Sequence, residues 1–133
     1  MAIEVEIVLR LLLATLLGGL IGYQRERAAK PAGLRTHILI CIGSALFTVA
    51  SLQGFGGAAD PARIAAGIVA GIGFLGAGAI LHREGGLVGG LTTAATIWVV
   101  AAIGLAAGAG LYVIAGVTTA IVLVVLFLPH PIR

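Results

Sequence analysis

Residues 64–81 read IAAGIVAGIGFLGAGAIL, eighteen consecutive residues without a charged side chain. A helix of this length is about 27 Å long, close to the roughly 30 Å hydrocarbon thickness of a bilayer. Four other apolar stretches of similar length flank it, at residues 5–23, 34–52, 91–107 and 111–128. The sequence therefore predicts an all-α polytopic membrane protein, with one transmembrane domain of five helices over residues 1–133.

The composition also argues against an ordinary soluble domain. Hydrophobic residues make up 60% of the chain and charged residues only 10%, whereas soluble domains carry about 25% charged residues. The net charge of +3 does not indicate nucleic-acid binding, because the basic residues do not cluster with aromatic residues on a soluble face. We therefore expect the lipid bilayer as the surrounding medium and no nucleic-acid partner.

Basic residues are distributed unequally between the two predicted sides of the membrane. Six lie on one side, namely Arg25, Arg27, Lys30, Arg35, Arg83 and Arg133, and two lie on the other, namely Arg10 and Arg63. Cytoplasmic connections carry an excess of Lys and Arg. This distribution predicts an N-terminus outside the cell and a C-terminus in the cytoplasm.

Small residues predict where the helices meet, because helices in lipid associate through close backbone approach. GxxxG pairs occur in three helices, as Gly18 with Gly22, Gly67 with Gly71, and Gly104 with Gly108. The third helix adds Gly73, Gly76 and Gly78. We therefore expect the third helix to be the central and most tightly packed one, and the fifth helix to be peripheral. Because the same surfaces suit self-association, we also expect a homo-oligomer, with a dimer favoured.

Trp98 falls in the middle of the fourth predicted span. Its indole N–H needs a hydrogen-bond partner, which lipid tails do not offer. We therefore expect Trp98 to face the bundle.

Charged residues flank the outer ends of the first and third spans. Arg10 must enter the membrane with its helix, and Glu6 lies one turn away as a partner. Asp60 followed by Pro61 is typical of a helix start, with Asp60 as the cap. The alternative is a polar cluster of Asp60 and Arg63 at the outer mouth, coupled to Glu6 and Arg10.

Similar segments recur along the chain and predict a parallel internal repeat of helices 1–2 and 3–4. The matched segments are Arg10 with Arg63, Arg25-Glu26 with Arg83-Glu84, and Gly33-Leu34-Arg35-Thr36 with Gly90-Leu91-Thr92-Thr93. Polar rings at both ends of a bundle suit a conduit or a binding site. The resulting candidates for ion binding or a polar cluster are Glu26, Glu84, Asp60, Arg10, Arg63, Arg25, Arg35 and Thr36.

No pattern typical of catalysis is found. The sequence has no phosphate-binding glycine loop with its Lys, and no nucleophile beside a base in a plausible site. His37, His82 and His130 fall at the predicted cytoplasmic border, where an interfacial position explains them. We expect neither an enzyme nor a resident cofactor, apart from Mg²⁺ as an ion to be bound.

Several segments resemble the MgtC/SapB family of bacterial inner-membrane proteins, and the resemblance extends from about Ile7 to Leu128. The segments are Gly19-Leu20-Ile21-Gly22 with Arg25-Glu26-Arg27, Pro31-Ala32-Gly33-Leu34-Arg35-Thr36-His37, Asp60-Pro61-Ala62-Arg63, Gly71-Ile72-Gly73-Phe74-Leu75-Gly76-Ala77-Gly78, and Gly90-Leu91-Thr92-Thr93-Ala94-Ala95 with Trp98. The resemblance implies a five-helix inner-membrane domain linked to magnesium homeostasis, adaptation to low magnesium and, in some pathogens, virulence. Members often carry a cytoplasmic C-terminal domain, which we expect to be absent from this chain.

Two functions stay open at this point. In the first, the chain forms a path for Mg²⁺, an ion that prefers oxygen ligands, with Glu26 and Asp60 as metal ligands and Glu84 as a further carboxylate. In the second, it is a non-conducting regulator that binds other membrane proteins, for which the resemblance implies the ATP synthase as one partner. A purely structural bundle is the third interpretation, and the costly charges beside the helices argue against it.

Overall fold

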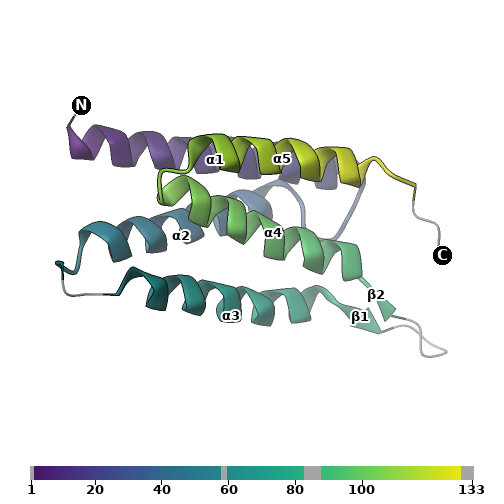
Figure 1. The fold of residues 1–133 in the computed structure, drawn as a ribbon. Helices are drawn as coiled ribbons and strands as arrows, with labels where there is room; N and C mark the ends of the chain where they lie inside the picture. Colours follow the sequence, from purple (N-terminus) through teal and green to yellow (C-terminus); the bar gives the residue numbers. More distant parts are fainter. Residues whose placement is uncertain (1, 58–59, 83–87, 130–133) are drawn as a thin grey trace.

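Five helices lie side by side along one axis in the computed structural model, which describes residues 2–57, 60–82 and 88–129 (Figure 1). The helices are α1 (Ile3–Arg27), α2 (Leu34–Gln53), α3 (Pro61–Ala79), α4 (Leu91–Gly108) and α5 (Tyr112–Leu126). Two short antiparallel strands, β1 (Leu81–His82) and β2 (Val88–Gly89), pair between α3 and α4. The prediction of five helices is therefore confirmed.

The helix boundaries follow from local signals in the sequence. Helix α1 ends just before Ala29, which adopts a left-handed φ of 58°, and Pro31 prevents its continuation. Helix α3 begins at Pro61, and the Asp60 side chain accepts a 3.0 Å hydrogen bond from the Ala62 N–H. Asp60 is thus an N-cap, and the helix begins three residues before the predicted span.

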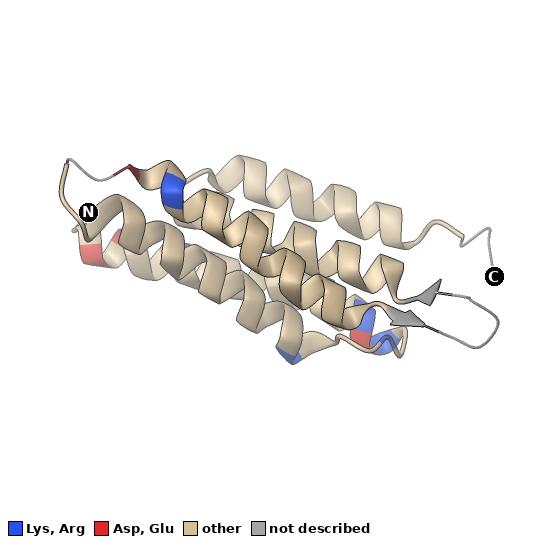
Figure 2. Cartoon of the chain, turned by 90° about the horizontal axis from the view of Figure 1, so that it is seen from below, with Lys and Arg blue, Asp and Glu red and all other residues tan. Residues whose placement is uncertain are grey.

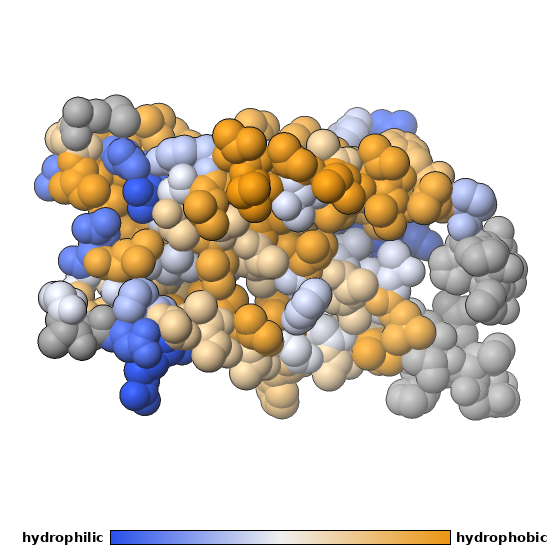
Figure 3. Space-filling model, viewed as in Figure 1, coloured by the Kyte–Doolittle hydropathy of each residue, from blue (hydrophilic) through white to orange (hydrophobic). Residues whose placement is uncertain are grey.

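Four of the helices are long and apolar enough to cross a membrane, namely α1 to α4. Helix α5 has 15 residues, which gives a length of about 22 Å, short of a full hydrocarbon crossing of about 30 Å. Large apolar side chains cover much of the outer surface, and Phe74 is 85% exposed (Figure 3). Such a surface suits lipid and not water, so the chain is a membrane protein.

Helices α2 and α4 pack against each other at the centre of the bundle, and α1 contacts both. The main core is formed by Ala14, Leu17, Ile21, Cys41, Ala45, Val100, Ile103, Ala107 and Ala115. Helix α5 lies against α1 and α4 and buries only Ala115 and Thr119. The fifth helix is therefore peripheral, as its composition predicts.

Glycines allow the backbones of the central helices to approach closely. A Cβ added at Gly18 would lie 2.7 Å from the Cβ of Cys41, and one at Gly108 would lie 2.5 Å from the Ala45 carbonyl oxygen. Gly22 and Gly104 meet backbone atoms of α2 in the same way. The GxxxG pairs of α1 and α4 thus both face α2, where a methyl group would not fit.

The expectation that the third helix is the central one is wrong. Only Ile72 and Gly76 of α3 are buried, and α4 has the larger buried share. A Cβ added at Gly67, Gly71, Gly73 or Gly78 would meet no atom within 4 Å. A run of glycines shows that a helix has a flat face, but it does not show that a neighbour in the same chain occupies this face.

The internal repeat stays a prediction. Helices α1 and α2 form one adjacent pair, and α3 and α4 form another. Gly33 and Gly90 both precede a helix, but their φ angles differ, −110° against 83°. Arg10 is largely buried whereas its counterpart Arg63 is exposed. Arg83 and Glu84 lie outside the described residues.

Candidate functional site

Charged residues gather at the two ends of the bundle and leave its middle apolar (Figure 2). One end holds Glu6, Arg10, Asp60 and Arg63, and the other holds Arg25, Glu26, Arg27, Lys30 and Arg35. Arg10 and Arg25 are both on α1 and are fifteen residues apart, which is about 22 Å along a helix. This distance is shorter than the hydrocarbon core, so both guanidinium groups need partners within the protein or at its boundary.

Arg25 is the most deeply buried charged residue among the described ones, with 3% of its surface exposed. Its Nη2 donates a 3.1 Å hydrogen bond to Oγ1 of Thr93 at the start of α4. Its Nε has no partner among the described residues, and neither does Oε1 of the adjacent Gln24. The described part of the chain also places no carboxylate within ion-pair distance of Arg25. A buried cation that is only partly satisfied is costly in free energy.

His37 of α2 is also fully buried. Its Nδ1 is 2.8 Å from the Gly33 carbonyl oxygen, and its Nε2 is 3.0 Å from Oγ1 of Thr96. Thr96 Oγ1 in turn lies 2.9 Å from the Thr93 carbonyl oxygen. Side chains of α1, α2 and α4 thus form one buried polar cluster, which we call the Arg25 cluster: Arg25, His37, Thr93 and Thr96.

Glu26, a predicted metal ligand, has a structural contact instead. Its Oε1 accepts a 3.0 Å hydrogen bond from the Leu34 N–H at the start of α2, where helix N–H groups lack partners. A Cβ at Gly33 would lie 2.5 Å from this oxygen, so a larger residue there would displace the Glu26 carboxylate. Glu26 therefore caps α2 from the end of α1, while Glu84 lies outside the described residues.

The opposite end of the bundle is organised around Arg10. Its Nη2 forms a 2.6 Å ion pair with Oε2 of Glu6, and its Nη1 donates a 2.9 Å hydrogen bond to the Gly108 carbonyl oxygen. The Tyr112 hydroxyl lies 3.3 Å from Arg10 Nε and donates to Glu6 at 3.0 Å. Arg10 thus joins α1 to the end of α4 and the start of α5, and the predicted Glu6 pairing is confirmed.

The predicted coupling between this group and the start of α3 is not found among the described residues. Asp60 uses its carboxylate to cap α3, and Arg63 is exposed without a described ion pair or hydrogen bond. Arg35 and Thr36 are also exposed, in the first turn of α2. The described residues contain no group of three potential metal ligands.

Trp98 does not face the interior of the bundle, so that prediction is wrong for the single chain. Its side chain is 55% exposed and lines a shallow pocket with residues of α3 such as Gly73 and Ala77. The indole lies where α3 leaves part of α4 uncovered. The orientation of Trp98 was therefore decided by which face of α4 the other helices cover, and not by the need of its indole N–H for a hydrogen-bond partner.

Sequence reasoning placed His37 at the membrane border and did not select Thr93 or Thr96 as site residues. A signal for His37 exists: His37, Cys41, Ser44 and Thr48 recur at spacings of four, three and four, and all are buried. This is the spacing of one helix face. In a helix surrounded by lipid, a stripe of small polar residues predicts the face that is turned toward other helices.

The fold and the Arg25 cluster define a polytopic helical membrane protein with buried cationic side chains. The chain belongs to the MgtC family, whose model matches residues 11–133. It is 52% identical over 114 residues to the "Putative magnesium transporter YhiD" of Escherichia coli K12, covering 80% of this chain and 53% of the relative. No solved structure matches the chain.

Two further relatives carry other names. "Protein MgtC" of Brucella abortus is 50% identical over 119 residues, which cover 90% of this chain and 49% of the relative. "Protein SapB" of Bacillus subtilis is 41% identical over 139 residues, which cover 98% of this chain and 60% of the relative. The chain therefore spans about half the length of the curated relatives that it matches.

Proposed function

We propose that the chain acts in magnesium homeostasis in a bacterial inner membrane as a non-conducting regulator, which binds another membrane protein. The observation that supports this best is the sign of the buried charges. Arg25 and Arg10 lie near the two ends of α1. Among the described residues, they are the most buried charged side chains. At the Arg25 end, a Mg²⁺ ion that entered the bundle would meet a positive charge that has no carboxylate partner among the described residues. At the other end, the Glu6 carboxylate is already paired with Arg10.

The contacts of the carboxylates also argue against a path for Mg²⁺ through the chain. Mg²⁺ binds through oxygen ligands, typically one or two carboxylates together with several waters. Glu26 and Asp60 are each committed to a helix N-terminus, and Glu6 to Arg10. Between the two ends, glycines bring the backbones of α1, α2 and α4 into contact, which leaves little space for a hydrated ion.

A regulator needs a surface for its partner, and α3 provides one. A Cβ added at Gly73 or Gly78 would meet no atom of the described residues within 4 Å, and small residues favour helix association in lipid. Either a second copy of the chain or a helix of a partner, such as the ATP synthase that the family resemblance implies, would suit this face. The Arg25 cluster is the part of the chain that we expect to respond to binding.

Transport is the second candidate, and one specific observation favours it: a relative with 52% identity carries the name of a putative magnesium transporter. Since the interior of one chain is closely packed, a path would have to lie between the chains of an oligomer. Exposed polar residues such as Arg63 and Thr36 would then line it.

Two measurements on the same protein separate the candidates. The first is growth at limiting magnesium of a bacterial strain that lacks its own family member and expresses this chain. The second is Mg²⁺ entry into liposomes that contain the purified chain and a magnesium-sensitive dye. We expect restored growth and no flux above protein-free vesicles. Saturable flux would establish transport, and a failure to restore growth would contradict the link to magnesium.

Arg25→Met tests the role of the Arg25 cluster in this function. We expect this variant to keep its thermal stability, because replacing a poorly paired buried charge by an apolar side chain is often neutral or stabilising, and to lose the growth phenotype. Arg27→Met, two residues along the same helix and exposed, is the matched control and should behave as wild type. A large loss of stability in Arg25→Met would instead make Arg25 a structural residue.

A further inference from the structure

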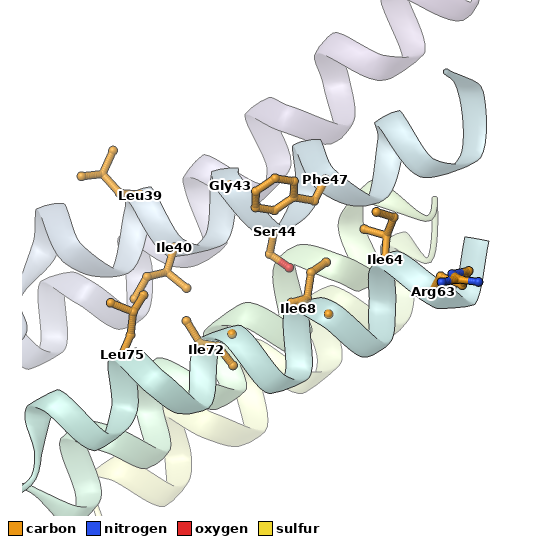
Figure 4. Close-up of a pocket in the computed structure, with 12 residues that line it drawn as sticks. Leu39, Ile40, Gly43, Ser44, Phe47, Arg63, Ile64, Ile68, Ile72 and Leu75 are labelled. Atoms are coloured by element: carbon orange, nitrogen blue, oxygen red, sulfur yellow. The ribbon is translucent and has the colours of Figure 1, made fainter. Parts of the chain in front are cut away.

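An apolar groove of about 540 Å³ lies between α2 and α3 on the surface of the bundle (Figure 4). Leu39 and Phe47 of α2 and Leu75 of α3 line it and are exposed. Gly43 and Gly67 also line the groove, and a Cβ at either would meet no atom within 4 Å. The groove is therefore not filled by any side chain of the described residues.

The groove has the length of one membrane leaflet. It extends along α3 from Arg63, in the first turn, to Leu75. Twelve residues of helix correspond to about 18 Å, slightly more than half of a hydrocarbon core of roughly 30 Å. An occupant that follows the groove would thus run from the membrane interface to the middle of the bilayer.

The two ends of the groove differ in chemistry. Arg63 lies at the interfacial end, exposed and without an ion pair among the described residues. Ser44, the other polar side chain among the described lining residues, donates its hydroxyl hydrogen to the Ala101 carbonyl oxygen at 2.6 Å. The groove therefore offers one cation at the depth of the lipid head groups and apolar walls below it.

We propose that this groove binds one anionic phospholipid, with its phosphate at Arg63 and an acyl chain along Gly43, Gly67 and Leu75. The charge complementarity and the leaflet length both fit such an amphiphile. A helix from another chain would use the glycines but would leave Arg63 at the interface without its anion. The proposal depends on the membrane location of the chain and not on its role in magnesium homeostasis.

Native mass spectrometry of the purified full chain tests this proposal, by titration with phosphatidylglycerol and with phosphatidylcholine of the same acyl chains. We expect phosphatidylglycerol to bind about fivefold more tightly, the effect of one basic residue beside an anionic lipid. Arg63→Gln should remove this preference. Arg35→Gln, at an exposed arginine outside the groove, is the matched control and should keep it.

Gly67→Leu tests the apolar part of the site, because its side chain would occupy the groove. It should lower the binding of both lipids, whereas Gly78→Leu, on the same helix but outside the groove, should not. The fluorescence of the single tryptophan and the thermal midpoint show whether each variant is folded. Equal binding of the two lipids by wild type, unchanged preference in Arg63→Gln, or full lipid binding by folded Gly67→Leu would each overturn the proposal.

Discussion

Nε2 of His37 lies 3.0 Å from Oγ1 of Thr96, although 59 residues separate the two in the sequence. The other ring nitrogen, Nδ1, lies 2.8 Å from the Gly33 carbonyl oxygen, which can only accept a hydrogen bond. Nδ1 must therefore carry a proton. The Thr96 hydroxyl has one hydrogen, which it donates to the Thr93 carbonyl oxygen at 2.9 Å, so in the neutral ring Nε2 competes with this carbonyl for the same hydrogen. One defined histidine tautomer thus connects α2 to α4 inside the bundle.

Thr96→Val should remove this connection with little change of shape. The expected loss of folding free energy is about 1–3 kcal/mol, because the buried Nε2 of His37 is left without a partner. Thr96→Ser should keep most of the wild-type stability. Thermal unfolding in detergent, followed by Trp98 fluorescence, measures the effect. Thr92→Val, at an exposed threonine of the same helix, should leave the stability unchanged. Equal stability of Thr96→Val and wild type would show that the bond contributes nothing.

Gly108→Ala should destabilise the bundle, because its methyl group would lie 2.5 Å from the Ala45 carbonyl oxygen. Forcing an extra carbon into a packed interface costs roughly 1–3 kcal/mol. Gly116→Ala is the control, since a Cβ there meets nothing within 4 Å and alanine favours a helix by about 1 kcal/mol over glycine. Denaturant titration of the two variants should shift their midpoints in opposite directions.

Glu6→Gln should weaken the attachment of α1 to α4 and α5. The variant loses the negative partner of Arg10 but keeps the hydrogen bonds of Arg10 to Gly108 and Tyr112, so we expect a small decrease of the thermal midpoint. Glu4→Gln, at an exposed glutamate two residues earlier in the same helix, should have no effect. If both variants unfold at the same temperature as wild type, the ion pair does not stabilise the chain.

The excess of basic residues predicts that the loop containing Lys30 is cytoplasmic. In a Cys41→Ser background, which removes the one native cysteine, Lys30→Cys should resist a membrane-impermeant maleimide applied to intact spheroplasts. Gln53→Cys, exposed at the end of α2, should react. Labelling after cell lysis shows that both sites are accessible. The reverse pattern in intact spheroplasts would invert the proposed orientation.

The sequence alone determined the number of helices and most of their boundaries. In a bilayer, backbone polar groups must be satisfied within the helix, so hydropathy and length identify each span. Signals within one helical turn, such as Asp60 before Pro61, then locate its start, and the partner of Arg10 was predictable because Glu6 is one turn away on the same helix. These features depend only on residues that are close along the chain.

The tertiary structure alone decided which faces meet. The glycines of α3 formed the strongest small-residue pattern, yet all of them except Gly76 face outward, while those of α1 and α4 contact α2. Glu26 became a cap for α2, and Arg25, His37 and Thr96 formed one buried cluster only because three helices converge there. The physical reason is that a sequence pattern defines the chemistry of a helix face, whereas its neighbour is set by how all the helices pack together.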